Sequence, residues 1–152
     1  MSRLIFLDSA PLGMVSNPKN TPICEECKAW LESLEPRGYS AIIPEIADYE
    51  VRRELLRAGM ANSIRRLDQL KSLLPYLPIT TSVMLKAAEL WAEARRSGYP
   101  TADPKALDGD VILAAQAILA VEGPNGANEV LIATTNVSHL ARFTDARDWR
   151  SI

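Results

Sequence analysis

The chain has 152 residues, of which 47% are hydrophobic and 24% are charged, as expected for one globular domain with a substantial core. Its net charge of −2 gives no overall attraction to nucleic acid, so a phosphate-bearing substrate would need a local basic patch or bound cations. The opening stretch MSRLIFLDSA is too short in apolar residues for a signal peptide, and no segment approaches the roughly 20 apolar residues that span a bilayer. We therefore expect a single domain over residues 1–152, in a cytoplasmic protein with no membrane partner.

The first half of the chain is predicted to alternate between strands and helices. An apolar run at 3–8 predicts a strand, and the Pro, Gly, Asn and Ser residues of 9–22 predict a loop after it. The segments that follow are expected to be a helix at 24–38, a strand at 39–44, a helix at 44–60 and a helix at 63–74.

The second half continues the alternation. A short strand is expected at 76–80, followed by a helix at 82–98 that Thr80 or Thr81 caps. The remaining expected segments are a loop at 99–110, a helix at 111–121 and a fourth strand at 129–136. Strands separated by helices predict an α/β fold, with a parallel sheet covered on both faces.

The only two cysteines, Cys24 and Cys27, form a C-x-x-C pair that is compatible with half a zinc site or a redox dithiol. No second Cys or His pair completes four zinc ligands, and the two glutamates between the thiols would disfavour a thiolate. Trp30 and Leu31 follow at helical spacing, so packing on an amphipathic helix is the favoured interpretation.

Polar residues stand at the predicted carboxyl ends of two strands, where open parallel sheets place their functional crevice. Asp8 follows the first strand, and Thr134 and Asn136 close the fourth. The helix before the fourth strand is expected to begin at Asp108 and Asp110, so these groups should meet at one edge of the sheet.

Each acid near this edge has a structural interpretation to be weighed beside a functional one. Asp108 can cap the following helix, with Asp110 in its first turn. Glu50 borders the buried face of the predicted helix at 44–60 and can pair with Arg53 at i+3. Asp8 follows a buried strand and has no such explanation, so it needs a partner or a metal.

Asp8, Glu50 and Asp110 together would concentrate negative charge in one crevice and raise one another's pKa values unless a cation neutralised them. Carboxylate oxygens suit Mg²⁺ or Mn²⁺, which bind one or two carboxylates and otherwise keep water or phosphate oxygens. Such an ion polarises a phosphodiester and activates a water, which is the chemistry of a nuclease.

The chain resembles the PIN-domain ribonucleases, and within them the toxins of the virulence-associated-protein-C type (VapC), over nearly its whole length. The opening acid of the family is similar to LIFLDS, which gives Asp8 with its small hydroxyl neighbour Ser9. The helical acid is similar to PEIADYEVRREL, which gives Glu50. The third acid is similar to DVILAAQA, which gives Asp110 rather than Asp108.

The last family motif is similar to TTNVSHL, which gives Thr134 and Asn136 as accessory residues. The fourth acid of the family is replaced by His139, and Leu140 stands in place of the aromatic residue. His139 is a candidate metal ligand or phosphate contact, although a surface or capping role is the commoner use of a lone histidine. Asp108 is the other residue that could take the place of the missing fourth acid.

The resemblance implies a three-layer α/β/α sandwich with a mainly parallel sheet of four or five strands, formed by one PIN domain over 1–152. It implies catalysis by Asp8, Glu50 and Asp110, with Mg²⁺ or Mn²⁺ held by Asp8 and Asp110. It also implies an RNA substrate, a homodimer and, for the toxin branch, a cognate antitoxin.

Five arginines follow Glu50 in the predicted helical region, and they are candidates for gripping phosphate or, more simply, members of solvated helix faces. Arg52 and Arg53 are the substrate-binding candidates, while Arg52 can equally pair with neighbouring glutamates. Two hypotheses follow. One is a metal-dependent endoribonuclease, and the other is a PIN-like binding or scaffold domain whose site has decayed, as the replacement by His139 suggests.

Overall fold

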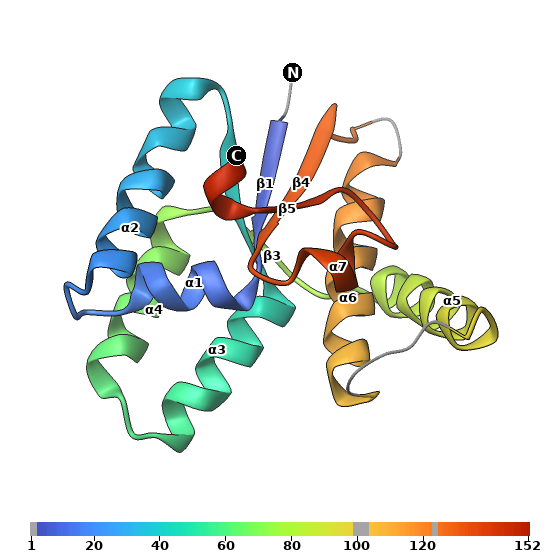
Figure 1. The fold of residues 1–152 in the computed structure, drawn as a ribbon, viewed down its shortest axis with the longest axis horizontal. Helices are drawn as coiled ribbons and strands as arrows, with labels where there is room; N and C mark the ends of the chain where they lie inside the picture. The colour runs from blue at the N-terminus through green and yellow to red at the C-terminus, as the bar shows by residue number, and fades with distance from the viewer. Residues whose placement is uncertain (1–2, 99–103, 123–124) are drawn as a thin grey trace.

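The computed structural model describes residues 3–98, 104–122 and 125–152, and Figure 1 shows it as a ribbon. Five strands form one sheet in the order β3-β2-β1-β4-β5, and every neighbouring pair is parallel. Helices α1 to α4 lie on one side of this sheet, and α5 and α6 lie on the other (Figure 1). The predicted three-layer α/β/α sandwich with a parallel sheet is confirmed.

The strands are buried on both faces, which explains their continuous apolar sequences. In the central strand β1, Ile5 and Leu7 pack under α1 and α2, whereas Phe6 packs under α6 on the other face. The strands are β1 (Arg3–Leu7), β2 (Ser40–Pro44), β3 (Tyr76–Leu77), β4 (Glu129–Thr134) and β5 (Ala146–Asp148). The first four fall within the segments expected from sequence. Strand β5 was not predicted, because its sequence ARD contains no apolar run.

The helices of the described chain form where apolar faces meet the sheet or one another. Thr80 caps α5 as expected, because its hydroxyl accepts a hydrogen bond from the backbone N–H of Val83. The helices are α1 (Ser9–Ser16), α2 (Pro22–Leu34), α3 (Glu45–Arg57), α4 (Ala61–Leu73), α5 (Thr81–Arg96), α6 (Pro104–Val121) and α7 (Val137–Leu140), with 3₁₀ turns η1 (Glu35–Arg37) and η2 (Trp149–Ser151).

The segment 9–22 was expected to be a loop, and this expectation is wrong for its first half. Residues Ser9–Ser16 form α1, which begins directly after β1 with Asp8 as its N-cap. Pro11 is compatible with the first turn, where no intrahelical donor is lost. Burial of Leu12 and Val15 against the sheet stabilises this helix, although its Pro and Gly residues favour a loop.

The segment 99–110 was also expected to be a loop. Residues 99–103 lie outside the described part of the chain, but α6 already begins at Pro104, in a position that favours proline. Leu107 is buried against α5, which accounts for the extra turn at the start of the helix. Asp108 and Asp110 are therefore inside α6, and the prediction that Asp108 caps the helix is wrong.

Cys24 and Cys27 are buried on α2 as free thiols, in agreement with a packing role. Burial raises the pKa of Cys27 to about 12, so this thiol stays protonated at neutral pH. Trp30 on the same helix packs edge-on against Trp149, with ring centroids 5.7 Å apart. Among the helices of the described residues, none combines the length and the apolar character needed to cross a membrane.

Candidate active site

Asp8 lies at the carboxyl end of the central strand and is held by hydrogen bonds from two sides. Its Oδ1 accepts from the backbone N–H of Ser9 at 2.7 Å, and its Oδ2 accepts from the hydroxyl of Thr134 at 2.7 Å. Burial raises the pKa of Asp8 above its usual range, and these hydrogen bonds oppose that rise. The structure thus joins Asp8 with the predicted accessory residues Ser9 and Thr134, because β1 and β4 are neighbours in the sheet.

Asp110 reaches the site from α6, and no described residue donates a hydrogen bond to its Oδ2. Its Oδ2 is buried without a hydrogen-bond partner among the described residues, and Nδ1 of His139 lies 3.6 Å away. Burial and then the charge of Asp8 raise the pKa of Asp110 to about 6, while the charges of His139 and Arg142 act in the opposite direction. A buried carboxylate oxygen without a donor is a place where a cation would be stabilised.

Glu50 reaches the same site from α3. Its carboxylate is 3.9 Å from the guanidinium of Arg53, so the i+3 pair expected from sequence is present, but only at long range. Burial raises the pKa of Glu50 to about 7, with further contributions from the charges of Asp8 and Asp110 and an opposing one from Arg53. The three predicted acids are therefore close enough to disfavour one another's ionised forms.

The turn after β4 supplies the remaining polar groups. The hydroxyl of Thr134 accepts from the backbone N–H of Asn136 at 2.9 Å, which orders the start of this turn. The side-chain amide of Asn136 lies 3.0 Å from Nδ1 of His139, on the one-turn helix α7. His139 thus lies beside Asp110, at the position where the family resemblance leads one to expect an acid.

Asp108 is not brought to these carboxylates. It is exposed and lies about 200° around α6 from Asp110, because two residues of a helix are separated by that angle. There it lines a cavity of about 400 Å³ between α5 and α6, together with Met84 and Trp91. The geometry removes the reason for treating Asp108 as a substitute metal ligand.

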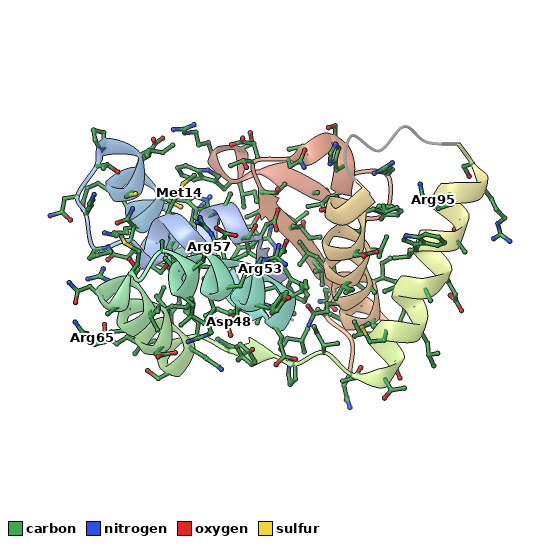
Figure 2. The ribbon with its side chains drawn as sticks, turned by 90° about the horizontal axis from the view of Figure 1, so that it is seen from below. Met14, Asp48, Arg53, Arg57, Arg65 and Arg95 are labelled. Carbon is green, nitrogen blue, oxygen red and sulfur yellow. The ribbon has the colours of Figure 1, made fainter. Side chains whose placement is uncertain are left out.

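The two substrate-binding candidates on α3 have different surroundings. Arg52 donates to Asp48 at 3.0 Å and to Asp68 at 2.8 Å, so it belongs to an ion-pair network beside α4. Arg53 points toward Glu50 and lies over the ring of Tyr49. Figure 2 shows the labelled Asp48 and Arg53 on different sides of α3. Arg52 is therefore paired, but with Asp48 and Asp68 and not with the glutamates expected from sequence.

Two neighbours of the acids were not anticipated from the sequence. Gly109 packs against the carboxylate of Glu50, and Arg142 contributes positive charge near Asp110. A glycine within a helix and directly before a candidate ligand is a signal that sequence inspection can detect. Arg142 carries no comparable signal, because its position depends on how the segment after α7 folds back.

The carboxylate oxygens of Asp8, Glu50 and Asp110 are ligands that a hard divalent cation such as Mg²⁺ prefers. The described residues contain no group of three Asp, Glu, His or Cys side chains preformed around one ion position. Mg²⁺ usually takes only one or two protein carboxylates and keeps several waters, so Asp8 and Asp110 are sufficient as ligands. The buried Oδ2 of Asp110, without a donor within the described residues, supports this fit.

Comparisons with solved structures find the same fold over nearly the whole chain. VapBC2 from Rickettsia felis, bound to a DNA fragment from its promoter, matches with a TM-score of 0.68 and 16% identity, covering 96% of this chain and 98% of the other. FitAcB from Neisseria gonorrhoeae matches with a TM-score of 0.67 and 19% identity, covering 97% and 99%. DNA-bound VapBC from Salmonella typhimurium matches with a TM-score of 0.58 and 19% identity, covering 98% and 99%.

At identities below 20%, these likenesses establish the fold alone. A search of curated proteins found no significant match. The sequence model of the PIN domain family, by contrast, matches residues 5–121, which include most of β1, all of α3 and α6, and the three acids Asp8, Glu50 and Asp110. The match extends over well more than half of the sequence, and on this basis the chain belongs to the PIN domain family.

Proposed function

We propose that this protein is an endoribonuclease that hydrolyses RNA phosphodiester bonds with Mg²⁺ or Mn²⁺ held by Asp8 and Asp110. The observation that carries the proposal is that Asp8, Glu50 and Asp110 lie near enough for the charge of Asp8 to raise the pKa values of the other two acids. Their raised pKa values mean that their negative charge is poorly compensated by the protein itself. Membership of the PIN domain family supports a nuclease.

Each acid has a distinct part in the proposed reaction. A bound divalent cation would lower the pKa of a water and stabilise charge on the phosphate. Asp8, oriented by Thr134 and Ser9, and Asp110 would hold that cation. Glu50, whose pKa is about 7 in the metal-free protein, would be placed to accept a proton from the attacking water. His139 and Arg53 border the acids and are candidates to contact phosphate.

We further propose that the protein is the VapC-like toxin of a toxin–antitoxin pair, with a cognate antitoxin and a homodimeric assembly. The support is the likeness in fold to chains of VapBC complexes and of FitAcB. Because that likeness is structural, a partner has to be tested directly. Co-expression with the product of a short neighbouring gene should give a stable complex whose RNA cleavage is reduced, and a partner that neither binds nor inhibits would contradict this part of the proposal.

The catalytic proposal is tested with Asp8→Asn and Asp110→Asn, which keep side-chain size and remove charge. Each variant should lose at least ~100-fold in Mn²⁺-dependent cleavage of a fluorescent single-stranded RNA, since a ligand and its charge are removed together. Circular dichroism should show an unchanged fold. Asp108→Asn is the matched control on α6 and should keep most of the activity, because Asp108 faces α5. Undiminished cleavage by both ligand variants would exclude this mechanism.

The alternative is a PIN domain with an impaired site that binds RNA or protein without cutting. The specific observation in its favour is His139 in place of an acid beside Asp110. It predicts no heat of Mn²⁺ binding in calorimetry and no cleavage by highly purified wild-type protein. Metal binding that Asp110→Asn abolishes would favour the enzyme.

A further inference from the structure

Gly109 occupies a position where the carboxylate of Glu50 leaves little room for a side chain. A Cβ atom built on Gly109 would lie 3.0 Å from Oε2 of Glu50, 3.3 Å from its Cδ and 3.4 Å from its Oε1. The first two distances are shorter than ordinary contacts of a Cβ atom, and the third is at the lower limit of such contacts. The carboxylate of Glu50 on α3 therefore lies directly against the backbone of α6, one residue before Asp110.

Helix formation does not explain this glycine. Gly109 is the sixth residue of α6, and glycine destabilises a helix interior relative to alanine. Nor is its backbone in the left-handed region, where the described positive-φ glycines are Gly38, Gly59 and Gly98. The remaining reason for glycine at such a site is close approach by another group, and here that group is the Glu50 carboxylate.

We propose that Gly109 is a positioning residue, whose missing side chain allows the Glu50 carboxylate to lie beside Asp110. The inference rests on the proposed nuclease function and deepens it. A methyl group at this position would meet only the far end of a flexible side chain, so α3 and α6 need not separate. Glu50 would instead rotate outward, on the side where Arg53 lies in solvent. The fold would be kept and the arrangement of the acids would be lost.

The test is Gly109→Ala, with Gly13→Ala as the matched control. Gly13 also lies within a helix, α1, and an added Cβ there meets nothing within 4 Å among the described residues. Both variants should unfold at the wild-type temperature or above, because alanine favours a helix. Gly109→Ala alone should reduce kcat for RNA cleavage by about tenfold or more with little change in KM, since a misplaced catalytic group affects the chemical step.

A readout independent of activity is the titration of Glu50, followed by NMR of its side-chain carboxyl carbon. In the metal-free wild type its pKa should be about 7, because of burial and the neighbouring acids. In Gly109→Ala it should move toward the ordinary value of 4.5, because the carboxylate enters solvent. In Gly13→Ala it should not move.

A double-mutant cycle separates positioning from a general effect on α6. Glu50→Asp shortens the acid by one methylene and withdraws it from Gly109. Adding Gly109→Ala to this background should cost no further activity, because the clash is gone, whereas adding it to the wild type is costly. Equal losses in both backgrounds would contradict the proposal.

The remaining outcomes are equally decisive. If Gly109→Ala keeps both the Glu50 titration and the cleavage rate of Gly13→Ala, the proposal is wrong. Failure of Gly109→Ala to fold would also overturn it, because the added atom is expected to displace a side chain only. If the wild type itself cuts no RNA, the proposed function fails, and the Glu50 titration still decides the role of Gly109.

Discussion

Helix α3 carries two largely buried acids, Asp48 and Glu50, whose surroundings are opposite in character. Asp48 is only 5% exposed and is surrounded by partners. Arg52 lies 3.0 Å from its Oδ1, the hydroxyl of Tyr76 donates to its Oδ2 at 3.2 Å, and the ammonium of Lys71 lies 3.9 Å away. A buried carboxylate with this many donors is a stable structural ion pair.

Glu50 lies two residues further on, which turns it about 200° around the helix and toward the other side. There it faces Asp8 and Asp110, and its only ion-pair partner among the described residues is the exposed Arg53 at 3.9 Å. The protein thus neutralises one acid of α3 with its own cations and leaves the other among like charges. This difference separates an acid that maintains the fold from one that is available for a metal or for proton transfer.

The largest effect is expected when Asp48 loses its partner Arg52. Arg52→Met should lower the free energy of unfolding by about 2 kcal/mol, because Asp48 stays buried with fewer partners. Urea denaturation followed by tryptophan fluorescence measures the change. Arg57→Met is the control from the same helix: its pair with Glu54 is exposed, so a loss below about 0.5 kcal/mol is expected. Similar losses in the two variants would show that the Asp48 network contributes little.

The uncompensated acids Glu50 and Asp110 should make the free energy of unfolding depend on pH. In the metal-free protein the pKa values of Glu50 and Asp110 are about 7 and 6, above their ordinary values of 4.5 and 3.8. At these two groups the folded state therefore binds more protons than the unfolded state between these limits, so the stability that Glu50 and Asp110 contribute is fully present below about pH 4 and is lost as pH rises to 7. The expected loss is roughly 1 to 2 kcal/mol, after allowance for partial exposure to solvent.

This pH dependence is checked by urea denaturation from pH 4 to pH 8 without metal. Glu50→Gln should flatten the curve and be the more stable protein at pH 8, because it removes an uncompensated charge. Saturating Mn²⁺ should flatten it as well, since a bound cation offsets the same repulsion. A wild-type curve that rises over this range would contradict the assignment of Glu50 and Asp110 as uncompensated acids.

The smallest expected effect is a difference between Asp8 and Asp110 in how far each raises the pKa of Glu50. The charge of Asp8 contributes more than that of Asp110 to the raised pKa of Glu50. Asp8→Asn should therefore lower the Glu50 pKa further than Asp110→Asn does, with each change expected to be about one unit or less. NMR titration of the Glu50 carboxyl carbon resolves such shifts. The opposite order would mean that the Glu50 carboxylate lies closer to the carboxylate of Asp110 than to that of Asp8 in solution.

The positions of the three acids could be predicted because local sequence carries a signal for each. Asp8 ends a continuous apolar strand, and Asp110 opens the apolar part of an alanine-rich helix. Glu50 was identified because it borders the buried face of its predicted helix and because it resembles a family motif, and periodicity alone would not have separated it from Asp48. The buried face of α3 in fact contains Ile46, Ala47, Asp48 and Val51.

Two local predictions fail for a shared physical reason. Pro11 and Gly13 predict a loop at α1 because they weaken a helix locally, whereas packing against the sheet outweighs that weakness. The sequence predicts that Asp108 caps a helix because acids favour that position, whereas α6 extends a further turn toward its start through burial of Leu107. In both places tertiary burial overrides local propensity.

By itself, the sequence determined the alternation of strands and helices and the acids that end or begin them, because apolar periodicity and polar end residues are local properties of the chain. Only the tertiary structure decided that β1 lies between β2 and β4, that Thr134 therefore reaches Asp8, and that the two acids of α3 face different neighbours. Those outcomes depend on contacts between segments up to 126 residues apart, such as Thr134 and Asp8, and no local pattern encodes which partner a side chain meets.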